Sequence, residues 1–154
     1  MLTLSEIAHA VDGVLSGEDV RFSSVSIDSR TLQPDALFVA IDGERFCGTD
    51  FARDAKQAGA VAVMASSAPD RETPSIVVKD TELALWKLAE LWRSRVSLPM
   101  IGVTGSNGKT TVKEMIASIL GKMGRTHASP GNFNNHLGVP LTLLGIRPEH
   151  EFAV

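Results

Sequence analysis

The chain has 154 residues, 44% of them hydrophobic and 21% charged, proportions typical of a globular protein and not of a disordered one. Its 15 basic and 18 acidic side chains give a net charge of −3, which disfavours a nucleic-acid partner. No apolar run approaches the length of a membrane span, so membrane insertion is not expected, and the N-terminus lacks the pattern of a secretory signal. The single cysteine, Cys47, fits a reducing compartment.

The first part of the chain predicts one helix and two strands. A capping box that starts at Thr3 predicts a helix over about residues 4–12. Alternating side chains predict a half-buried strand at residues 25–28, and a polar turn follows it. The apolar run 37–41 predicts a buried strand, and residues 42–45 then have the composition of a loop.

Helices and strands alternate in the next part of the chain. Residues 51–58 predict a helix, and the apolar runs 60–64 and 76–78 predict strands. Asp80 is placed to cap a long amphipathic helix that follows it. The alternation indicates an α/β fold with a largely parallel sheet, and residues 93–99 are the candidate boundary between two units.

The strongest functional signal follows this boundary. The apolar segment 100–103 predicts a strand that enters a turn containing Gly105 and Gly108, and Lys109 and Thr110 then open a helix. Glycines let backbone N–H groups converge on phosphate oxygens, and a helix N-terminus adds partial positive charge. The lysine would neutralise the β and γ phosphates of ATP, and the threonine hydroxyl could bind Mg²⁺. The helix would present one apolar face, made of Val112, Met115, Ile116, Ile119 and Leu120.

One position departs from the general phosphate-loop pattern. That pattern has a glycine five residues before Gly108, where this chain has Val103. An ordinary strand-turn-helix with a solvated Lys109 is the alternative. Because the strand, two glycines, the lysine and paired threonines coincide, an ATP site is the better interpretation.

A second polar cluster lies in residues 131–140, which contain three asparagines and His136. Asparagines are common in purely structural turns, and that interpretation stays open. A loop at the carboxyl edge of a parallel sheet is, however, where such sheets bind ligands.

The segments 104–111 and 131–140 together resemble the ATP-dependent Mur ligases of peptidoglycan synthesis, a family that uses this same glycine spacing. Residues 28–46 resemble the UDP-binding domain of the family member that adds a dipeptide. The resemblance implies a small N-terminal UDP-binding α/β domain at residues 1–97. It also implies that residues 98–154 are the first, incomplete part of a central parallel-sheet P-loop ATPase domain.

The resemblance implies an ATP-dependent amide ligase of the cytoplasm that serves cell-wall biogenesis and hence cell shape and division. Such an enzyme transfers the γ-phosphoryl group of ATP to the terminal carboxylate of UDP-N-acetylmuramoyl-tripeptide. The amine of D-alanyl-D-alanine then attacks the acyl phosphate. ATP and Mg²⁺ are the implied cofactors, and we expect a monomer.

The resemblance also assigns residues to roles. Lys109 and Thr110 would be catalytic, with Thr110 as the Mg²⁺ ligand. The UDP-substrate would contact Ser29, Arg30, Gly43 and Thr49, the last of which stands where many relatives have a histidine. The alternative for Arg30 is a surface ion pair with Asp28 or Asp35. The ATP-binding set would be Thr104, Gly105, Ser106, Asn107, Gly108, Lys109, Thr110, Thr111, Asn134 and Asn135.

Two alternatives to this ligase remain from the sequence. One is a non-catalytic module that binds UDP compounds or ATP, and the other is the neighbouring ligase that adds a diamino acid. Phosphoryl transfer needs a later acidic residue for Mg²⁺, and Glu149 and Glu151 are wrongly placed for it. We therefore expect the chain to be an N-terminal fragment with no ligase turnover by itself.

Overall fold

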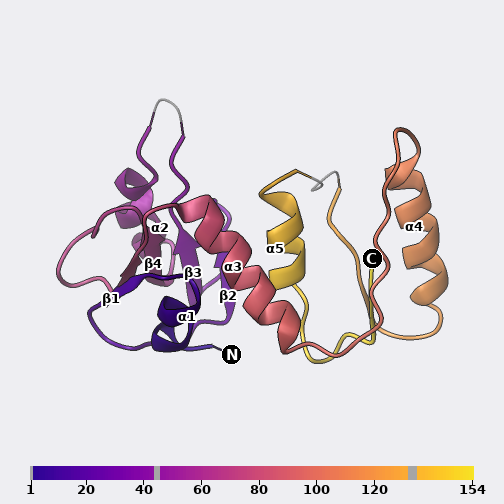
Figure 1. Ribbon diagram of the computed structural model, residues 1–154, viewed down its shortest axis with the longest axis horizontal. Helices are drawn as coiled ribbons and strands as arrows, with labels where there is room; N and C mark the ends of the chain where they lie inside the picture. The colour runs from indigo at the N-terminus through magenta and orange to yellow at the C-terminus, as the bar shows by residue number, and fades with distance from the viewer. Residues whose placement is uncertain (1, 44–45, 132–134) are drawn as a thin grey trace. The chain divides into compact units, whose positions relative to one another are not determined.

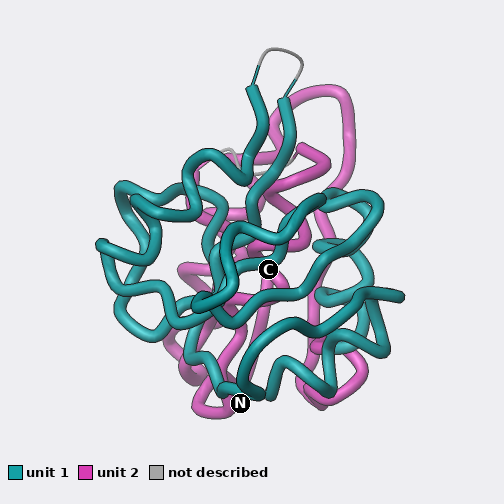
Figure 2. The backbone as a smooth tube through the Cα atoms, turned by 90° about the vertical axis from the view of Figure 1, so that its left-hand side faces the viewer, with its two compact units in different colours: residues 1–91 teal, residues 92–154 magenta. Residues whose placement is uncertain are grey.

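The computed structural model describes residues 2–43, 46–131 and 135–154. The chain divides into two compact units, residues 1–91 and 92–154 (Figure 2). The division falls near the end of a helix, α3 (Thr81–Ser94), just before the boundary expected at residues 93–99. The assignment of a substrate domain to residues 1–97 and an ATPase portion to residues 98–154 stays a prediction.

Unit 1 is built on a five-stranded sheet in the order β1-β5-β4-β3-β2. Figure 1 labels β1, β2, β3 and β4 of this sheet. The pairs β2–β3, β3–β4 and β4–β5 are parallel, which confirms the largely parallel α/β fold. The edge strand β1 pairs antiparallel with β5 and was not expected, because its three residues show no alternation. The strands are β1 (Val14–Ser16), β2 (Ser24–Ser26), β3 (Ala36–Val39), β4 (Ala60–Ala65) and β5 (Ser75–Val77).

The helices of unit 1 begin where the sequence supplies caps. At α1 (Leu4–Ala10), the Thr3 hydroxyl accepts a 3.4 Å hydrogen bond from the Glu6 amide, and the Glu6 carboxylate accepts one of 2.8 Å from the Thr3 amide. The Asp80 carboxylate accepts from the Leu83 amide at 2.9 Å and so caps α3. The expected helix 51–58 forms as a 3₁₀ turn, η1 (Gly48–Phe51), followed by α2 (Ala52–Gln57).

The core of unit 1 lies around the two central strands. Every residue of β3 is buried, and so are all but one of β4. Burial of a side chain such as Leu37 or Met64 stabilises the fold by about 1.5–3 kcal/mol. This core fixes the carboxyl end of β3, from which the chain enters the loop at Asp42.

Unit 2 has a smaller sheet. Its elements are α4 (Lys109–Leu120), β6 (Thr126–His127), α5 (Gly138–Leu144) and β7 (Phe152–Ala153), with β6 and β7 parallel. The expected strand 100–103 is reduced to a parallel bridge between Met100 and Ala153. Among the described residues, this segment pairs only with β7. The Ile101 amide donates to the Ala153 carbonyl, and the Ala153 amide donates to the Pro99 carbonyl, so the ladder stays short.

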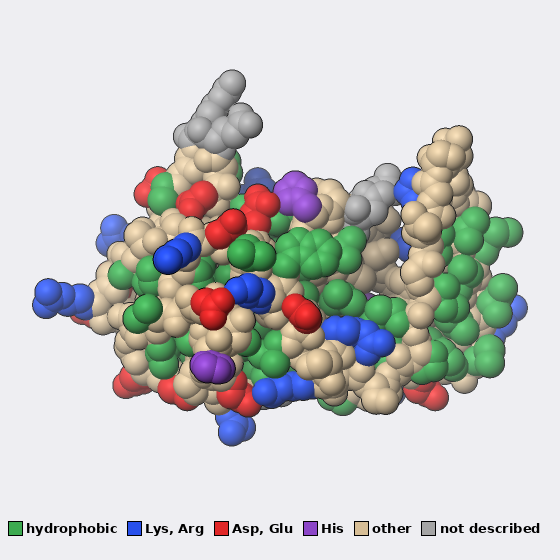
Figure 3. All heavy atoms as spheres, viewed as in Figure 1, with side chains coloured by type: hydrophobic (Ala, Val, Ile, Leu, Met, Phe, Trp, Pro, Cys, Tyr) green, Lys and Arg blue, Asp and Glu red, His purple; other side chains and the backbone are tan. Residues whose placement is uncertain are grey.

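The apolar face expected on α4 is largely open to solvent in this chain. The side chains of Val112, Met115 and Ile119 are 44%, 62% and 62% exposed. Figure 3 shows hydrophobic atoms gathered over the α4 region. Within the described residues, no helix combines the length and apolar character that crossing a bilayer requires.

Candidate functional site

The glycine turn of unit 2 has a backbone that only glycine adopts easily. Gly105 has a φ of +148° and Gly108 a φ of +76°, both in the region that side chains disfavour. Gly108 is the N-cap of α4 and provides no side chain to cap the helix. The positive end of the α4 helix dipole therefore lies at this turn, where it favours an anion. The predicted loop residues Thr104, Ser106, Asn107 and Thr111 are exposed around this turn.

Lys109 begins α4, and its ammonium donates a 2.6 Å hydrogen bond to the Gly105 carbonyl. The side chain therefore spans the glycine turn that precedes it. A phosphate bound at the turn would offer this ammonium a charged acceptor in place of the neutral carbonyl, and charge-assisted hydrogen bonds are the stronger kind. The geometry is that of a phosphate-binding loop.

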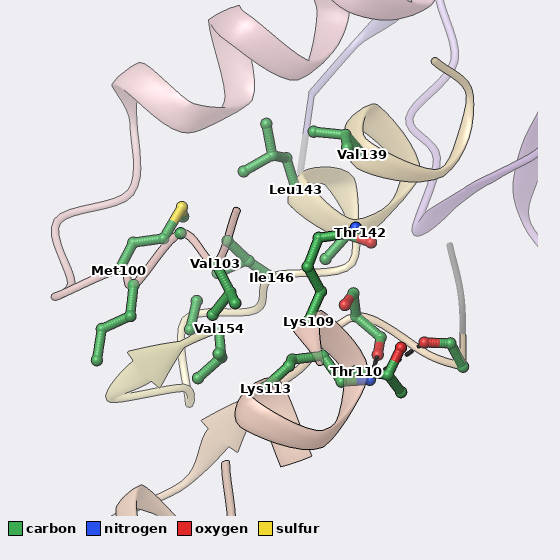
Figure 4. A pocket seen from close by; sticks show the side chains of 15 residues that line it. Met100, Val103, Lys109, Thr110, Lys113, Val139, Thr142, Leu143, Ile146 and Val154 are labelled. Carbon is green, nitrogen blue, oxygen red and sulfur yellow. Dashed lines mark hydrogen bonds between the residues drawn. The ribbon is translucent and has the colours of Figure 1, made fainter. Parts of the chain in front are cut away.

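A cavity of about 230 Å³ opens beside this turn. Figure 4 shows Lys109, Thr110 and Lys113 projecting from α4 at its wall, while Val139, Thr142 and Leu143 come from α5. The structure thus brings the two predicted catalytic residues together at one cavity. The rest of the lining is Met100, Ile101, Gly102, Val103, Ser129, Gly131, Ile146, Ala153 and Val154.

The asparagine loop is described only in part, since Asn134 lies outside the described residues. The Asn135 side-chain oxygen accepts a 2.7 Å hydrogen bond from the Gly138 amide at the start of α5. Asn135 therefore stabilises the start of α5, which is the structural role that the sequence left open for the asparagines of this loop. Its predicted contact with ATP stays a prediction.

Lys113 was missed as a site residue. Its position four residues after Lys109 places both lysines on one face of α4, and this spacing was the available signal. Its side chain is 8% exposed, and its ammonium donates to the carbonyls of Ser129 and Gly131 at 2.6 and 3.2 Å.

In unit 1, Arg30 forms the surface ion pair that the sequence left open. Its Nε and Nη2 donate to the two Asp28 carboxylate oxygens at 2.9 and 2.8 Å. These hydrogen bonds lower the pKa of Asp28 to about 2. The Arg30 side chain is 85% exposed, and Ser29 lies beside it in the same turn.

The other predicted UDP residues flank the loop after β3. The Asp42 carboxylate accepts a 2.9 Å hydrogen bond from the buried Gly48 amide. Hydrogen bonds to the Asp42 carboxylate lower its pKa. The bond with the Ser66 hydroxyl has the larger effect, and the bond from the Gly48 amide has the next largest. The Thr49 hydroxyl accepts from the Ser67 hydroxyl at 3.3 Å.

Phe46 lies beside this loop. The Phe46 and Phe51 rings meet edge-to-face with their centroids 5.8 Å apart. Phe46 also forms a bridge with Gly43, a predicted UDP contact.

A glycine turn that leads from a parallel α/β sheet into a lysine at a helix N-terminus is the arrangement that defines phosphate-loop proteins. Two family models match it: the Mur ligase family, catalytic domain, over residues 21–92, and the Mur ligase middle domain over residues 103–154. Together these ranges take in most of the chain, and the chain belongs to the Mur ligase family.

Individual relatives agree with this assignment. The UDP-N-acetylmuramoyl-tripeptide–D-alanyl-D-alanine ligase of Escherichia coli K12 is 46% identical over 153 residues, which are 99% of this chain and 34% of the relative. A crystal structure of MurF from Acinetobacter baumannii superposes with a TM-score of 0.88 at 36% identity, covering 99% of this chain and 34% of that one.

MurF ligase from Thermotoga maritima, solved in complex with ADP, has a TM-score of 0.72 at 33% identity, over 85% of this chain and 31% of that one. The chain spans about a third of the length of the relatives it matches.

Proposed function

We propose that this chain supplies the UDP-substrate-binding and phosphate-binding parts of an ATP-dependent ligase that adds D-alanyl-D-alanine to UDP-N-acetylmuramoyl-tripeptide. The names of its relatives support this choice over the neighbouring diamino-acid-adding ligase. The reaction would take place in the cytoplasm, as a step of peptidoglycan precursor synthesis. The single observation that carries the proposal is the glycine turn with Lys109 across it at the N-terminus of α4.

The reaction needs two displacements. The terminal carboxylate of the UDP-tripeptide attacks the γ-phosphorus of ATP, and ADP leaves. The dipeptide amine then attacks the acyl carbon, loses a proton and expels phosphate. Because a carboxylate is a poor electrophile, the acyl phosphate makes the amide bond accessible.

The protein's part in the first displacement is to position the groups and to neutralise charge. The residues of unit 2 fit this task. Lys109 would move its ammonium from the Gly105 carbonyl to the transferring phosphoryl group. The backbone N–H groups of the turn and of the first turn of α4 would hold the other phosphates. Mg²⁺ would bind the Thr110 hydroxyl, an oxygen ligand of the kind it prefers, and would supply further neutralisation of the phosphates.

The UDP end would bind at the turns of unit 1 through Ser29, Arg30, Gly43 and Thr49. The ion pair with Asp28 uses the Nε and Nη2 atoms of Arg30, so Nη1 is still able to donate to a pyrophosphate oxygen. The pair is exposed, and rearranging it on ligand binding costs little.

Titration of ATP with Mg²⁺ into the chain tests the nucleotide site. We expect Lys109→Ala to abolish detectable binding, because the charge for the phosphates is lost. Lys122→Ala, which removes an exposed lysine two residues beyond α4, should leave the affinity unchanged. Equal ATP affinity in the wild type and in Lys109→Ala would contradict the proposal.

A further inference from the structure

The residues predicted for the UDP end of the substrate leave one part of it without a suitable contact. A UDP group has a charged pyrophosphate, a ribose and a flat aromatic base. Arg30 offers charge to the pyrophosphate, and the hydroxyls of Ser29 and Thr49 offer hydrogen bonds. None of the predicted residues is aromatic, whereas proteins commonly hold a base by stacking it on an aromatic ring.

Two exposed phenylalanines lie in the segment that contains the predicted contacts. Phe46 is 55% exposed and Phe51 is 41% exposed, and their rings meet edge-to-face with centroids 5.8 Å apart. The other phenylalanines of unit 1, Phe22 and Phe38, are buried. The exposed pair therefore forms an apolar surface that the core of unit 1 does not use.

Gly43 is the seat of the Phe46 ring. The Gly43 amide donates to the Phe46 carbonyl at 3.1 Å, and the two residues form an antiparallel bridge. A Cβ at residue 43 would lie 2.4 Å from Cε1 and 2.5 Å from Cζ of the ring, so the ring occupies space that a glycine leaves open. The position of the Phe46 ring thus depends on the missing side chain of Gly43, and Phe51 provides its second contact.

Phe46 lies at the same edge of the sheet as the turn of Arg30. Because β2, β3 and β4 are parallel neighbours, the segments after them leave the sheet at one edge, where such sheets bind ligands. Arg30 follows β2, and Phe46 and Thr49 follow β3. Ser67 follows β4, and its hydroxyl donates to the Thr49 hydroxyl at 3.3 Å. This edge therefore offers a cation, hydroxyls and an aromatic ring, which match the pyrophosphate, the ribose and the base.

We propose that the ring of Phe46 stacks on the uracil base of the UDP-linked substrate, and that Gly43 acts by seating this ring and not by direct contact. The inference rests on the proposed function and deepens it, because it assigns recognition of the base to one side chain. Arg30 serves the pyrophosphate, and Phe46 serves the base.

Isothermal titration of UDP-N-acetylmuramoyl-tripeptide into Phe46 variants tests the stacking. We expect the affinity to fall about tenfold in Phe46→Ala and Phe46→Leu, the size of one lost base–aromatic stack, and to stay within about twofold in Phe46→Tyr. Leu83→Ala, the matched control, removes an exposed apolar side chain of α3 and should leave the affinity unchanged. Wild-type affinity in Phe46→Leu would show that an aromatic ring is not needed and would overturn the proposal.

Proton NMR of the bound ligand provides a direct measurement on the wild type. The ring current of a stacked phenylalanine shifts the uracil H5 and H6 resonances upfield. We expect this shift in the wild type and in Phe46→Tyr, and we expect its loss in Phe46→Leu. Unshifted resonances in the wild-type complex would overturn the stacking even if no Phe46 variant folds.

Gly43→Ala separates a seating role from a direct contact. Its methyl group displaces the ring, so we expect Gly43→Ala to lose as much affinity as Phe46→Ala, and the double variant to lose no more than either. Additive losses would overturn the seating role of Gly43. If the wild type binds the UDP-tripeptide and Phe46→Leu binds it equally, the stacking alone fails. If the wild type does not bind it, the proposed function fails as well.

Discussion

Replacing Gly48 by alanine inserts a methyl group into a place where the three nearest atoms are backbone atoms. The new Cβ would lie 2.4 Å from the Ala40 carbonyl carbon, against the 3.4 Å at which ordinary contact begins, so the two segments must separate by about 1 Å. Ala40 is fully buried, and its amide donates to the Met64 carbonyl at 2.8 Å, which resists such a shift. The separation would also weaken the 2.9 Å hydrogen bond from the Gly48 amide to Asp42.

These contributions set the magnitude. Overpacking costs about 1–3 kcal/mol, and the weakened hydrogen bond adds about 0.5–1.5 kcal/mol. Alanine also lowers the conformational entropy of the unfolded chain, which stabilises the folded state by about 0.4–1 kcal/mol. We therefore expect Gly48→Ala to lower the free energy of unfolding of unit 1 by about 2 kcal/mol, within limits of about 0.5–4 kcal/mol, in urea titrations followed by circular dichroism.

Gly43→Ala is the matched control, because its Cβ would also lie 2.4 Å from its nearest neighbour. That neighbour is the exposed ring of Phe46, which can rotate away, so we expect a loss below about 0.5 kcal/mol. A loss in Gly48→Ala no larger than that in Gly43→Ala would refute the argument, which depends on what the methyl group meets and not on distance alone.

Two further predictions concern unit 2. Burial lowers the pKa of His127 below 6.5, and its Nε2 must donate to the Thr142 carbonyl at 2.8 Å. The unfolded chain then binds the proton more tightly, so the stability of unit 2 should be full above about pH 6.5 and fall as the pH drops through the folded pKa. Urea unfolding at pH 7.5 and 5.5 measures this loss of stability, and we expect the difference between the two pH values to be smaller in His127→Asn than in the wild type. An equal difference in both proteins would show that His127 does not cause the pH dependence. The second prediction concerns α4: its exposed face should let its amides exchange with solvent faster than those of β4, whereas equal protection in hydrogen exchange would show that α4 is not the weaker element.

The parts of the fold that depend on local pattern could be predicted from the sequence. The buried runs gave β3 and β4 nearly to the residue, and the caps at Thr3 and Asp80 placed the starts of α1 and α3. β1 could not be predicted, because its three residues lie at an edge with no alternation and are specified by pairing with β5. The segment 100–103 has a strand composition, but strand formation also depends on a neighbour, and only β7 is beside it in the described chain.

The candidate site also has parts that a local pattern predicts and parts that depend on contacts between distant residues. The turn from Gly105 to Lys109 was recognisable because its function depends on consecutive residues. The contact between Lys113 and Ser129 joins segments 16 residues apart, which no local pattern encodes. For Arg30, the sequence left substrate binding and an ion pair open, and only the structure shows the pairing with Asp28.

The most direct test of the account is a comparison of two UDP-linked peptides as ligands of this chain. Isothermal titration with UDP-N-acetylmuramoyl-tripeptide and with the corresponding UDP-dipeptide measures which substrate the chain prefers. We expect tighter binding of the tripeptide form, the acceptor of D-alanyl-D-alanine. Tighter binding of the dipeptide form would contradict it and favour the diamino-acid-adding ligase.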